Sequence, residues 1–229
     1  MKNIIFVIAF TMLLIPISIK AQSFYMETGF NSIGRLNYTN TGALSSNTAT
    51  TLTPQFSSEV GIRYPYSERS IFSMGLTRNH FRYTNVIYYP LNASATEDFE
   101  AISYFDLEFL GGNLGVDYSI IETEKWTLFF SGKFSGNILS SGTLNSRLND
   151  VDESLFPNLN NDLMFDSNFQ KIWFNLHYGF MMSYKVSELA SVCSRYSMNN
   201  TINFNETDAE NYGFNSHTFS VGLILHVGK

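Results

Sequence analysis

Apolar and polar residues alternate with a period of two through most of the chain from residue 22 onward. Successive side chains of a β-strand point to opposite faces, so this pattern predicts strands. In the last segment Phe219, Val221 and Leu223 share one face, and Ser220 and Gly222 share the other. No stretch after residue 22 approaches the roughly 20 apolar residues of a membrane-spanning helix. The chain therefore forms either a β-sandwich or a closed β-barrel.

Eight segments carry the alternating pattern. They cover residues 24–31, 56–64, 72–77, 105–118, 126–138, 172–184, 192–198 and 218–227. In the fourth segment the apolar residues change parity between Phe109 and Leu114. Because Gly111 and Gly112 lie at the change, we predict a β-bulge there.

The connections between these segments alternate strictly between long and short. Short connections cover residues 65–69, 121–125 and 186–189, and long polar ones cover 39–54, 84–100, 141–166 and 203–212. Outer-membrane barrels have short periplasmic turns and long outer loops. A sandwich has no reason to alternate its loops so regularly. The sequence therefore predicts an all-β, eight-stranded antiparallel up-and-down transmembrane barrel with both termini in the periplasm.

The first residues have the composition of a bacterial signal peptide. Lys2 is followed by an almost unbroken apolar run from residue 4 to residue 15, and Pro16 precedes a plausible cleavage site at Ala21. The run is too short for a transmembrane helix. We predict a cleaved signal peptide at residues 1–21 and a barrel domain at residues 22–229.

The composition excludes several functions. Hydrophobic residues make up 44% of the chain and charged residues only 15%, which suits a protein with lipid outside and polar contents inside. A net charge of −6 argues against binding to nucleic acid. The single cysteine, Cys193, excludes an internal disulfide and a multi-cysteine zinc site. Four aromatic residues near segment ends are expected at the periplasmic interface: Tyr64, Tyr118, Trp126 and Tyr184.

The large apolar side chains are expected to face lipid and the polar faces to line the lumen. An eight-stranded barrel is only wide enough for its own side chains, and buried charges are tolerable when they are paired. Charges of both signs occur on the polar faces in nearly equal numbers, which favours a plugged lumen over an open pore. The predicted lumen charge network comprises Glu27, Glu59, Arg63, Asp106, Glu108, Asp117, Lys133, Lys171, His177 and Arg195.

The chain resembles the OmpX-like and PorT-like families of eight-stranded outer-membrane barrels. The signal peptide ending at Ala21 and the runs at residues 104–109, 130–136 and 219–225 carry this resemblance. One departure is that the chain ends in His226-Val227-Gly228-Lys229, whereas many such barrels end on an aromatic residue used in assembly. Members of these families are variously adhesins, stress proteins and secretion-system components, so the resemblance implies a location and a shape more than an activity.

No catalytic residues are predicted. Lipid A deacylase barrels use a histidine followed two positions later by serine, whereas here Arg82, Gly179, Phe219 and Gly228 follow the four histidines at that spacing. The Asp150-x-Asp152 spacing lacks the glycine and terminal glutamate of a calcium loop. We therefore expect no enzyme activity, no cofactor and no metal site.

The outer loops and one strand end are the expected contact surfaces. Acidic residues cluster in three long loops, at positions 97–100, 150–153 and 206–210. Arg78, His80 and Arg82 continue the apolar parity of their strand, and charges there must lie above the hydrocarbon. They would then meet lipopolysaccharide phosphates, unless the strand simply ends or bulges.

The expected partners are outer-membrane lipid, lipopolysaccharide and a protein bound by the loops. The predicted function is a structural, adhesion or interaction scaffold. The alternatives are a narrow pore or transport component and a lipid-modifying enzyme.

Overall fold

The computed structural model describes residues 22–39, 51–52, 55–90, 98–148, 160–162, 171–202 and 211–227. Within these ranges, no helix has the length and apolar character needed to cross a membrane. The predicted signal peptide lies outside the described residues. Eight long strands form the fold: β1 (Gln22–Thr39), β3 (Gln55–Pro65), β4 (Ser70–Pro90), β5 (Asp98–Glu122), β6 (Trp126–Leu148), β8 (Ile172–Lys185), β9 (Ala190–Ile202) and β10 (Asn211–Val227).

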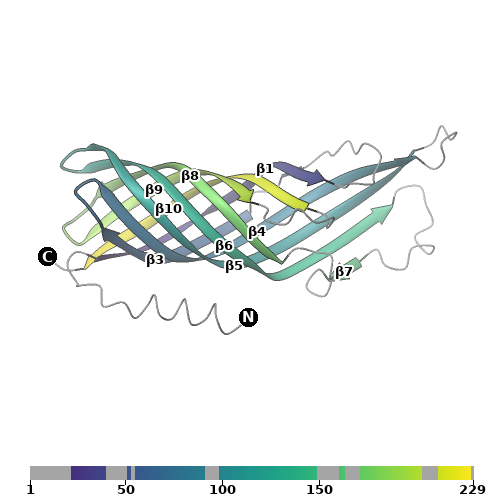
Figure 1. Cartoon of the computed structure of the whole chain (residues 1–229), viewed down its shortest axis with the longest axis horizontal. Helices are drawn as coiled ribbons and strands as arrows, with labels where there is room; N and C mark the ends of the chain where they lie inside the picture. Colours follow the sequence, from purple (N-terminus) through teal and green to yellow (C-terminus); the bar gives the residue numbers. More distant parts are fainter. Residues whose placement is uncertain are drawn as a thin grey trace.

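The eight strands close into a barrel (Figure 1). Each pairs antiparallel with the next in the chain, and β1 pairs with β10 from Gln22↔Val227 to Thr39↔Asn211. Closure leaves no unpaired edge in the barrel wall, as a lipid environment requires. The structure confirms the predicted eight-stranded up-and-down barrel. Two short strands, β2 (Thr51–Leu52) and β7 (Asn160–Asp162), pair with β4 and β6 along the edges that β3 and β8 occupy lower in the barrel.

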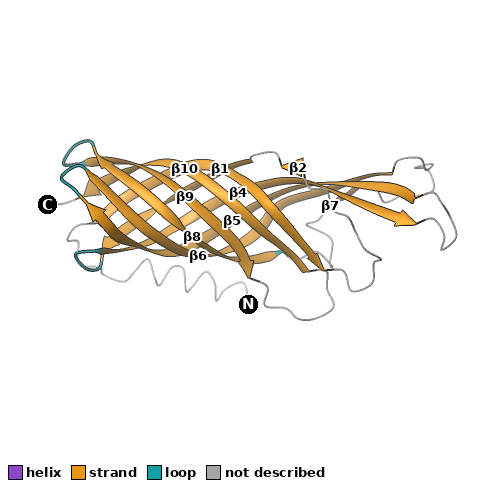
Figure 2. Cartoon of the chain, turned by 90° about the horizontal axis from the view of Figure 1, so that it is seen from above, coloured by secondary structure: helices purple, strands orange, loops and turns teal. Residues whose placement is uncertain are grey.

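The two ends of the barrel differ. Three short turns lie at the end where β10 finishes, and the longest strands extend past the opposite end (Figure 2). The predicted loop at residues 84–100 is wrong, because β4 and β5 stay paired from Thr84↔Tyr104 to Pro90↔Asp98. The predicted loop at 141–166 begins too early, since β6 continues to Leu148. Beyond the membrane these strands no longer need an apolar outer face, so the expected alternation is lost there while the backbone pairing continues.

The predicted bulge at Gly111 and Gly112 is also wrong. Both glycines pair without interruption with β4 and with β6. The register between β5 and β6 shifts instead near Ser140 and near Ile120. Odd-numbered residues of β5 face the lumen from Phe105 to Ser119. The apparent change of parity is therefore a change in which face is apolar, not a change in the strand.

Apolar side chains form an exposed belt around the barrel. On β5 the belt runs over eleven residues from Leu110 to Ile120, and both end residues are about half exposed. A transmembrane strand tilted in a bilayer needs about 9–11 residues. Near the short turns, the rings of Trp126 and Tyr184 pack with their centroids 4.4 Å apart, as expected at a membrane interface. The belt therefore marks the membrane-spanning part of the barrel.

Candidate functional site

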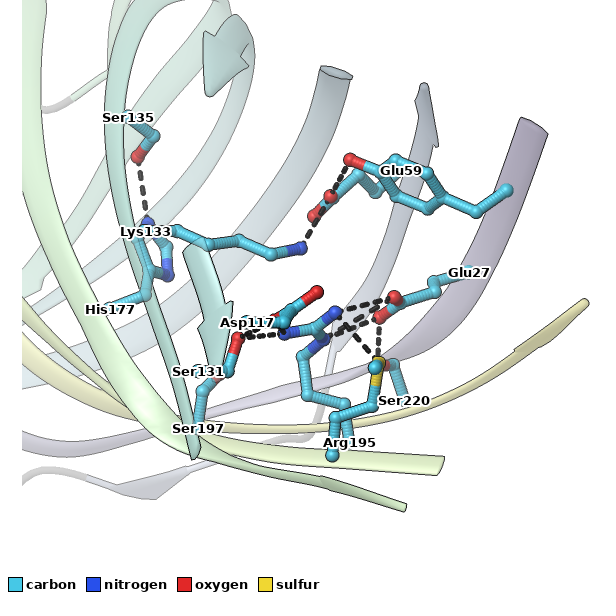
Figure 3. A network of polar contacts seen from close by, with 12 residues as sticks. Glu27, Glu59, Asp117, Ser131, Lys133, Ser135, His177, Arg195, Ser197 and Ser220 are labelled. Atoms are coloured by element: carbon cyan, nitrogen blue, oxygen red, sulfur yellow. Dashed lines mark hydrogen bonds and ion pairs between the residues drawn. The ribbon is translucent and has the colours of Figure 1, made fainter. Parts of the chain in front are cut away.

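A buried arginine lies at the centre of the lumen (Figure 3). The Arg195 guanidinium, carried by β9, donates through Nε to Glu27 Oε2 at 3.0 Å and through Nη1 to Asp117 Oδ1 at 3.2 Å. Ser220 donates a further hydrogen bond of 2.9 Å to Glu27. Glu27, Asp117 and Arg195 are each at most 6% exposed. One cation thus bridges carboxylates from β1 and β5 across the barrel.

Two further cations complete the charge balance. Arg63 Nη2 lies 2.9 Å from Asp117 Oδ2, and Lys133 Nζ lies 2.5 Å from Glu59 Oε1. The Tyr25 hydroxyl also donates to Glu59. The three carboxylates of Glu27, Glu59 and Asp117 face three cations, so this lumen network has no net charge. Pairing of this kind offsets much of the cost of burying the charges, although Arg63 Nε stays buried without a hydrogen-bond partner among the described residues.

His177 lies at the edge of the lumen network. Its Nε2 is 2.7 Å from Ser135 Oγ, and its cross-strand neighbour on β9 is Asn199. A neighbouring serine, histidine and asparagine resemble a hydrolytic triad. However, Ser135 is 1% exposed, and the adjoining cavity of about 50 Å³ has room for only a few water molecules. The arrangement therefore offers no path for a substrate.

Apolar side chains fill the lumen above the network, towards the long loops. Phe105, Leu107, Phe109 and Leu139 are each at most 4% exposed. The Phe109 ring packs against buried Trp173 with the centroids 4.8 Å apart. The space left beside this pair is only about 10 Å³. The lumen is therefore closed twice, by the ion pairs and then by this apolar plug.

Between the two closures lies a layer of amide side chains. Asn31 donates to Asn79 at 3.3 Å, and Thr77 donates to Asn137 at 3.2 Å. Asn199 donates to Thr218 at 2.7 Å. These neutral groups bond with one another, so they mark the transition from the charged to the apolar part of the lumen.

Asp106 and Glu108 lie outside the lumen, so their predicted place in its network is wrong. Both are on the outer face of β5, because Phe105, Leu107 and Phe109 occupy the inner face. Arg78 holds Glu108 through Nε and Nη2 at 2.9 and 3.1 Å, while His80 and Arg82 both contact Asp106. We call these five residues the outer ladder.

The outer ladder lies beyond the belt and is largely exposed. Burial alone would raise the pKa of the Asp106 carboxyl, but hydrogen bonds from His80 and Arg82 outweigh it and lower that pKa. The hydrogen bond from Arg78 lowers the pKa of the Glu108 carboxyl. Both carboxyls are therefore ionised at neutral pH. The three basic residues of the ladder occupy the face that the sequence predicted.

Lys171 does not join the lumen network. It precedes β8, and the structure gives it no ion pair with any described residue; its carbonyl accepts a hydrogen bond from Leu139.

Six of the ten predicted residues form the lumen network, and His177 lies next to it. Sequence reasoning did not single out Tyr25 or Trp173 as lumen residues. Their parity, shared with Glu27 and with Asn175, was the available signal. Among the described residues no group of side chains could hold a metal ion.

Comparisons with known proteins found similar solved structures but no related sequence. No family model matches the sequence, and no curated protein matches it. Similar solved structures include the Neisserial surface protein A, with 13% identity over 90% of this chain and 97% of that chain and a TM-score of 0.48. Others are OprG of Pseudomonas aeruginosa (12%, 92% and 98%, TM-score 0.45) and Ail of Yersinia pestis (10%, 91% and 99%, TM-score 0.42). At this identity the likeness says nothing about activity.

Proposed function

We propose that the chain is an integral outer-membrane β-barrel that acts as a sealed scaffold. In this function the barrel anchors the protein, and structural, adhesive or interaction roles fall to its outer end. The observation that carries the proposal is the double closure of the lumen. A solute would have to displace both the lumen network and the apolar plug, whose remaining spaces of about 50 and 10 Å³ hold little more than water.

The orientation follows from the two ends of the barrel. The short turns lie at the same end as Gln22 and Val227, and outer-membrane barrels keep such turns in the periplasm. The extended ends of β4, β5 and β6 then reach outward and carry the long loops. Most of the acidic loop residues lie outside the described residues. Their charge, read from the sequence, fits a partner protein with a basic surface.

An enzymatic function is not proposed. Hydrolysis would need a serine and histidine pair that a substrate can reach. Ser135 and His177 lie within the closed lumen. At the turn end His226 contacts Ser23 and Ser191 at 3.0 and 2.9 Å, but no carboxylate among the described residues is shown to orient its ring.

Conductance separates the scaffold from a pore. The barrel is refolded into planar bilayers, and its insertion is verified by the gel shift between heated and unheated samples. We expect no current steps under applied voltage, because no continuous water path crosses the lumen. Reproducible steps from the inserted barrel would contradict the proposal.

A second experiment tests the outer loops. Changing Glu97, Asp98 and Glu100 to glutamine and asparagine removes the negative charge at the far end of the extended β4–β5 pair, where Asp98 and Glu100 belong to β5. We expect the variant to insert normally and to lose cross-links to its partner on intact cells. A variant with Glu124→Gln, on the opposite end of the barrel, is the matched control. Equal cross-linking by both variants would count against recognition through this end of β4 and β5.

A further inference from the structure

Glycines on the two faces of the barrel wall differ in their surroundings. A Cβ added to inward-facing Gly29 or Gly61 would lie 2.2 Å from a backbone oxygen, so no larger residue fits there. A Cβ on outward-facing Gly112 would lie no closer than 3.6 Å to any atom, and one on Gly132 would meet nothing within 4 Å. Packing within the chain therefore explains the inner glycines but not the outer ones. Glycine inside a strand weakens it and often marks a place where a ligand approaches the backbone closely.

Two of the outward glycines lie within a hollow on the lipid-facing surface. Gly112 of β5 and Gly136 of β6 are direct cross-strand partners. The hollow has a volume of about 740 Å³, and Leu76, Leu114 and Phe134 form part of its apolar wall. We call it the glycine hollow. Because it opens on the exposed belt, a membrane component must fill it.

The outer ladder begins directly beside the glycine hollow. Leu76 pairs with Gly112, and the next outward residues on these two strands are Arg78 and Leu110, which also pair. The Arg78 side chain is 59% exposed. Its Nε and Nη2 bind Glu108, so Nη1 remains directed away from that pair. A guanidinium can bind a phosphate with donors that an existing ion pair leaves free.

A second hollow on the belt provides a comparison. It has a volume of about 590 Å³ and lies near Trp126 and Tyr184 at the turn end, over Ser194 of β9. No charged residue of the described chain lines either hollow. The glycine hollow differs in its position, because Arg78 is the next outward residue after Leu76, which lines it, and so places a charge at its outer edge.

We propose that the glycine hollow and the outer ladder together bind one lipopolysaccharide molecule of the outer leaflet. An acyl chain lies against the bare backbone of Gly112, beside Gly136 and the Phe174 ring that borders it, and a sugar phosphate contacts Arg78. The inference rests on the proposed outward orientation of the extended strands. The ladder alternates cations with carboxylates, which suits a headgroup that carries both phosphates and sugar hydroxyls.

Native mass spectrometry tests this site. The full barrel is extracted from outer membranes in mild detergent, and the lipopolysaccharide and phospholipid retained per barrel are measured after washing. Gly112→Leu fills the hollow, and we expect a several-fold loss of retained lipopolysaccharide. Arg78→Gln removes one charged contact, and we expect roughly a tenfold weaker retention. Gly132→Leu adds the same side chain to the belt outside the hollow, and Ser194→Leu fills the second hollow. Both controls should retain as much as the unchanged protein.

Each outcome is decisive. Loss in Gly112→Leu and Arg78→Gln, with retention in both controls, supports the site. Equal retention in all four variants, or retention of phospholipid only, overturns it. An equal loss in the controls shows a general effect of leucine on the belt and also overturns it. A barrel that is silent in bilayers yet binds no lipopolysaccharide contradicts this inference alone, whereas a conducting barrel that binds it contradicts the scaffold alone.

Discussion

The membrane-spanning part of the barrel and its outer extension have opposite arrangements of polar and apolar side chains. Along the belt, Leu114 and Val116 of β5 face outward while Asp117 lies buried in the lumen. A few residues away on the same strand, Leu107 and Phe109 are buried while Asp106 and Glu108 face outward. The membrane-spanning part has the polarity of a barrel in lipid, and the outer extension has that of a barrel in water. One strand therefore crosses from one solvent to the other without any change in its backbone.

The largest effect should come from breaking the lumen network. Arg195→Leu leaves Glu27 and Asp117 buried near fewer cations, and loss of one partner of a buried ion pair costs about 3–5 kcal/mol. Urea unfolding of the barrel in lipid vesicles measures this loss. The double variant Glu27→Gln with Arg195→Leu should recover part of the stability, since it removes one orphaned charge. An Arg195→Leu barrel as stable as the unchanged protein would show that the lumen charges are not coupled.

The apolar plug should be the next most sensitive region. Leu107 is 0% exposed, and replacing a fully buried leucine by alanine costs about 3 kcal/mol. Leu114→Ala removes the same atoms from the lipid-facing side, where lipid can fill the space, and should cost much less. The same urea titration compares the two variants. A larger loss of stability in Leu114→Ala than in Leu107→Ala would contradict a buried apolar core in the extension.

The free-energy cost of introducing a charge on the outer face should depend on whether the position lies inside the belt or beyond it. Leu114→Arg places a cation in the belt and should cost about 2–4 kcal/mol. Thr143→Arg places it on the outer face of β6 beyond the belt, where it meets water and headgroups at little cost. The fraction of each variant that folds into vesicles, read from the heat-dependent gel shift, separates them. Similar yields for both would place the membrane boundary elsewhere.

The smallest effect is the pH dependence of the outer ladder. The pKa of the Asp106 carboxyl is lowered on folding, so its ion pairs contribute stability above the ordinary carboxyl pKa of about 4. That contribution disappears as the pH falls through the lowered pKa. Asp106→Asn should therefore weaken the protein slightly at pH 7, and by less than about 1 kcal/mol because the pair is exposed. The two proteins should become equal in acid. A difference in stability that grows in acid would contradict a lowered pKa of the Asp106 carboxyl in the folded protein.

The sequence predicted the barrel because strand parity and loop lengths are local signals. Both report on single strands, and closure then follows from the requirement that no edge meets lipid. Parity also placed Glu27, Arg63 and Arg195 on the lumen side. Parity cannot show whether the outward face of a strand meets lipid or water. If the apolar face is assigned to lipid along all of β5, Asp106 and Glu108 fall inside the lumen and a bulge is required at Gly111 and Gly112.

Side-chain partners were beyond the reach of such reasoning. Arg195 and Glu27 are separated by 168 positions in the chain and meet only because β1 and β10 close the barrel. The glycine hollow depends in the same way on the register that pairs Gly112 with Gly136. Parity separates outward glycines from inward ones, but only the surrounding atoms show that Gly112 borders a hollow.

Chemical labelling along the outer face of β5 tests the change of solvent most directly. Cys193 is replaced by serine, and single cysteines are introduced at Asp106, Glu108, Gly112, Leu114 and Val116 in the folded barrel in vesicles. A water-soluble maleimide should label the cysteines at positions 106 and 108 and leave those at 112, 114 and 116 unreacted. Protection at 106 and 108, or labelling at 114, would contradict a membrane boundary at Leu110.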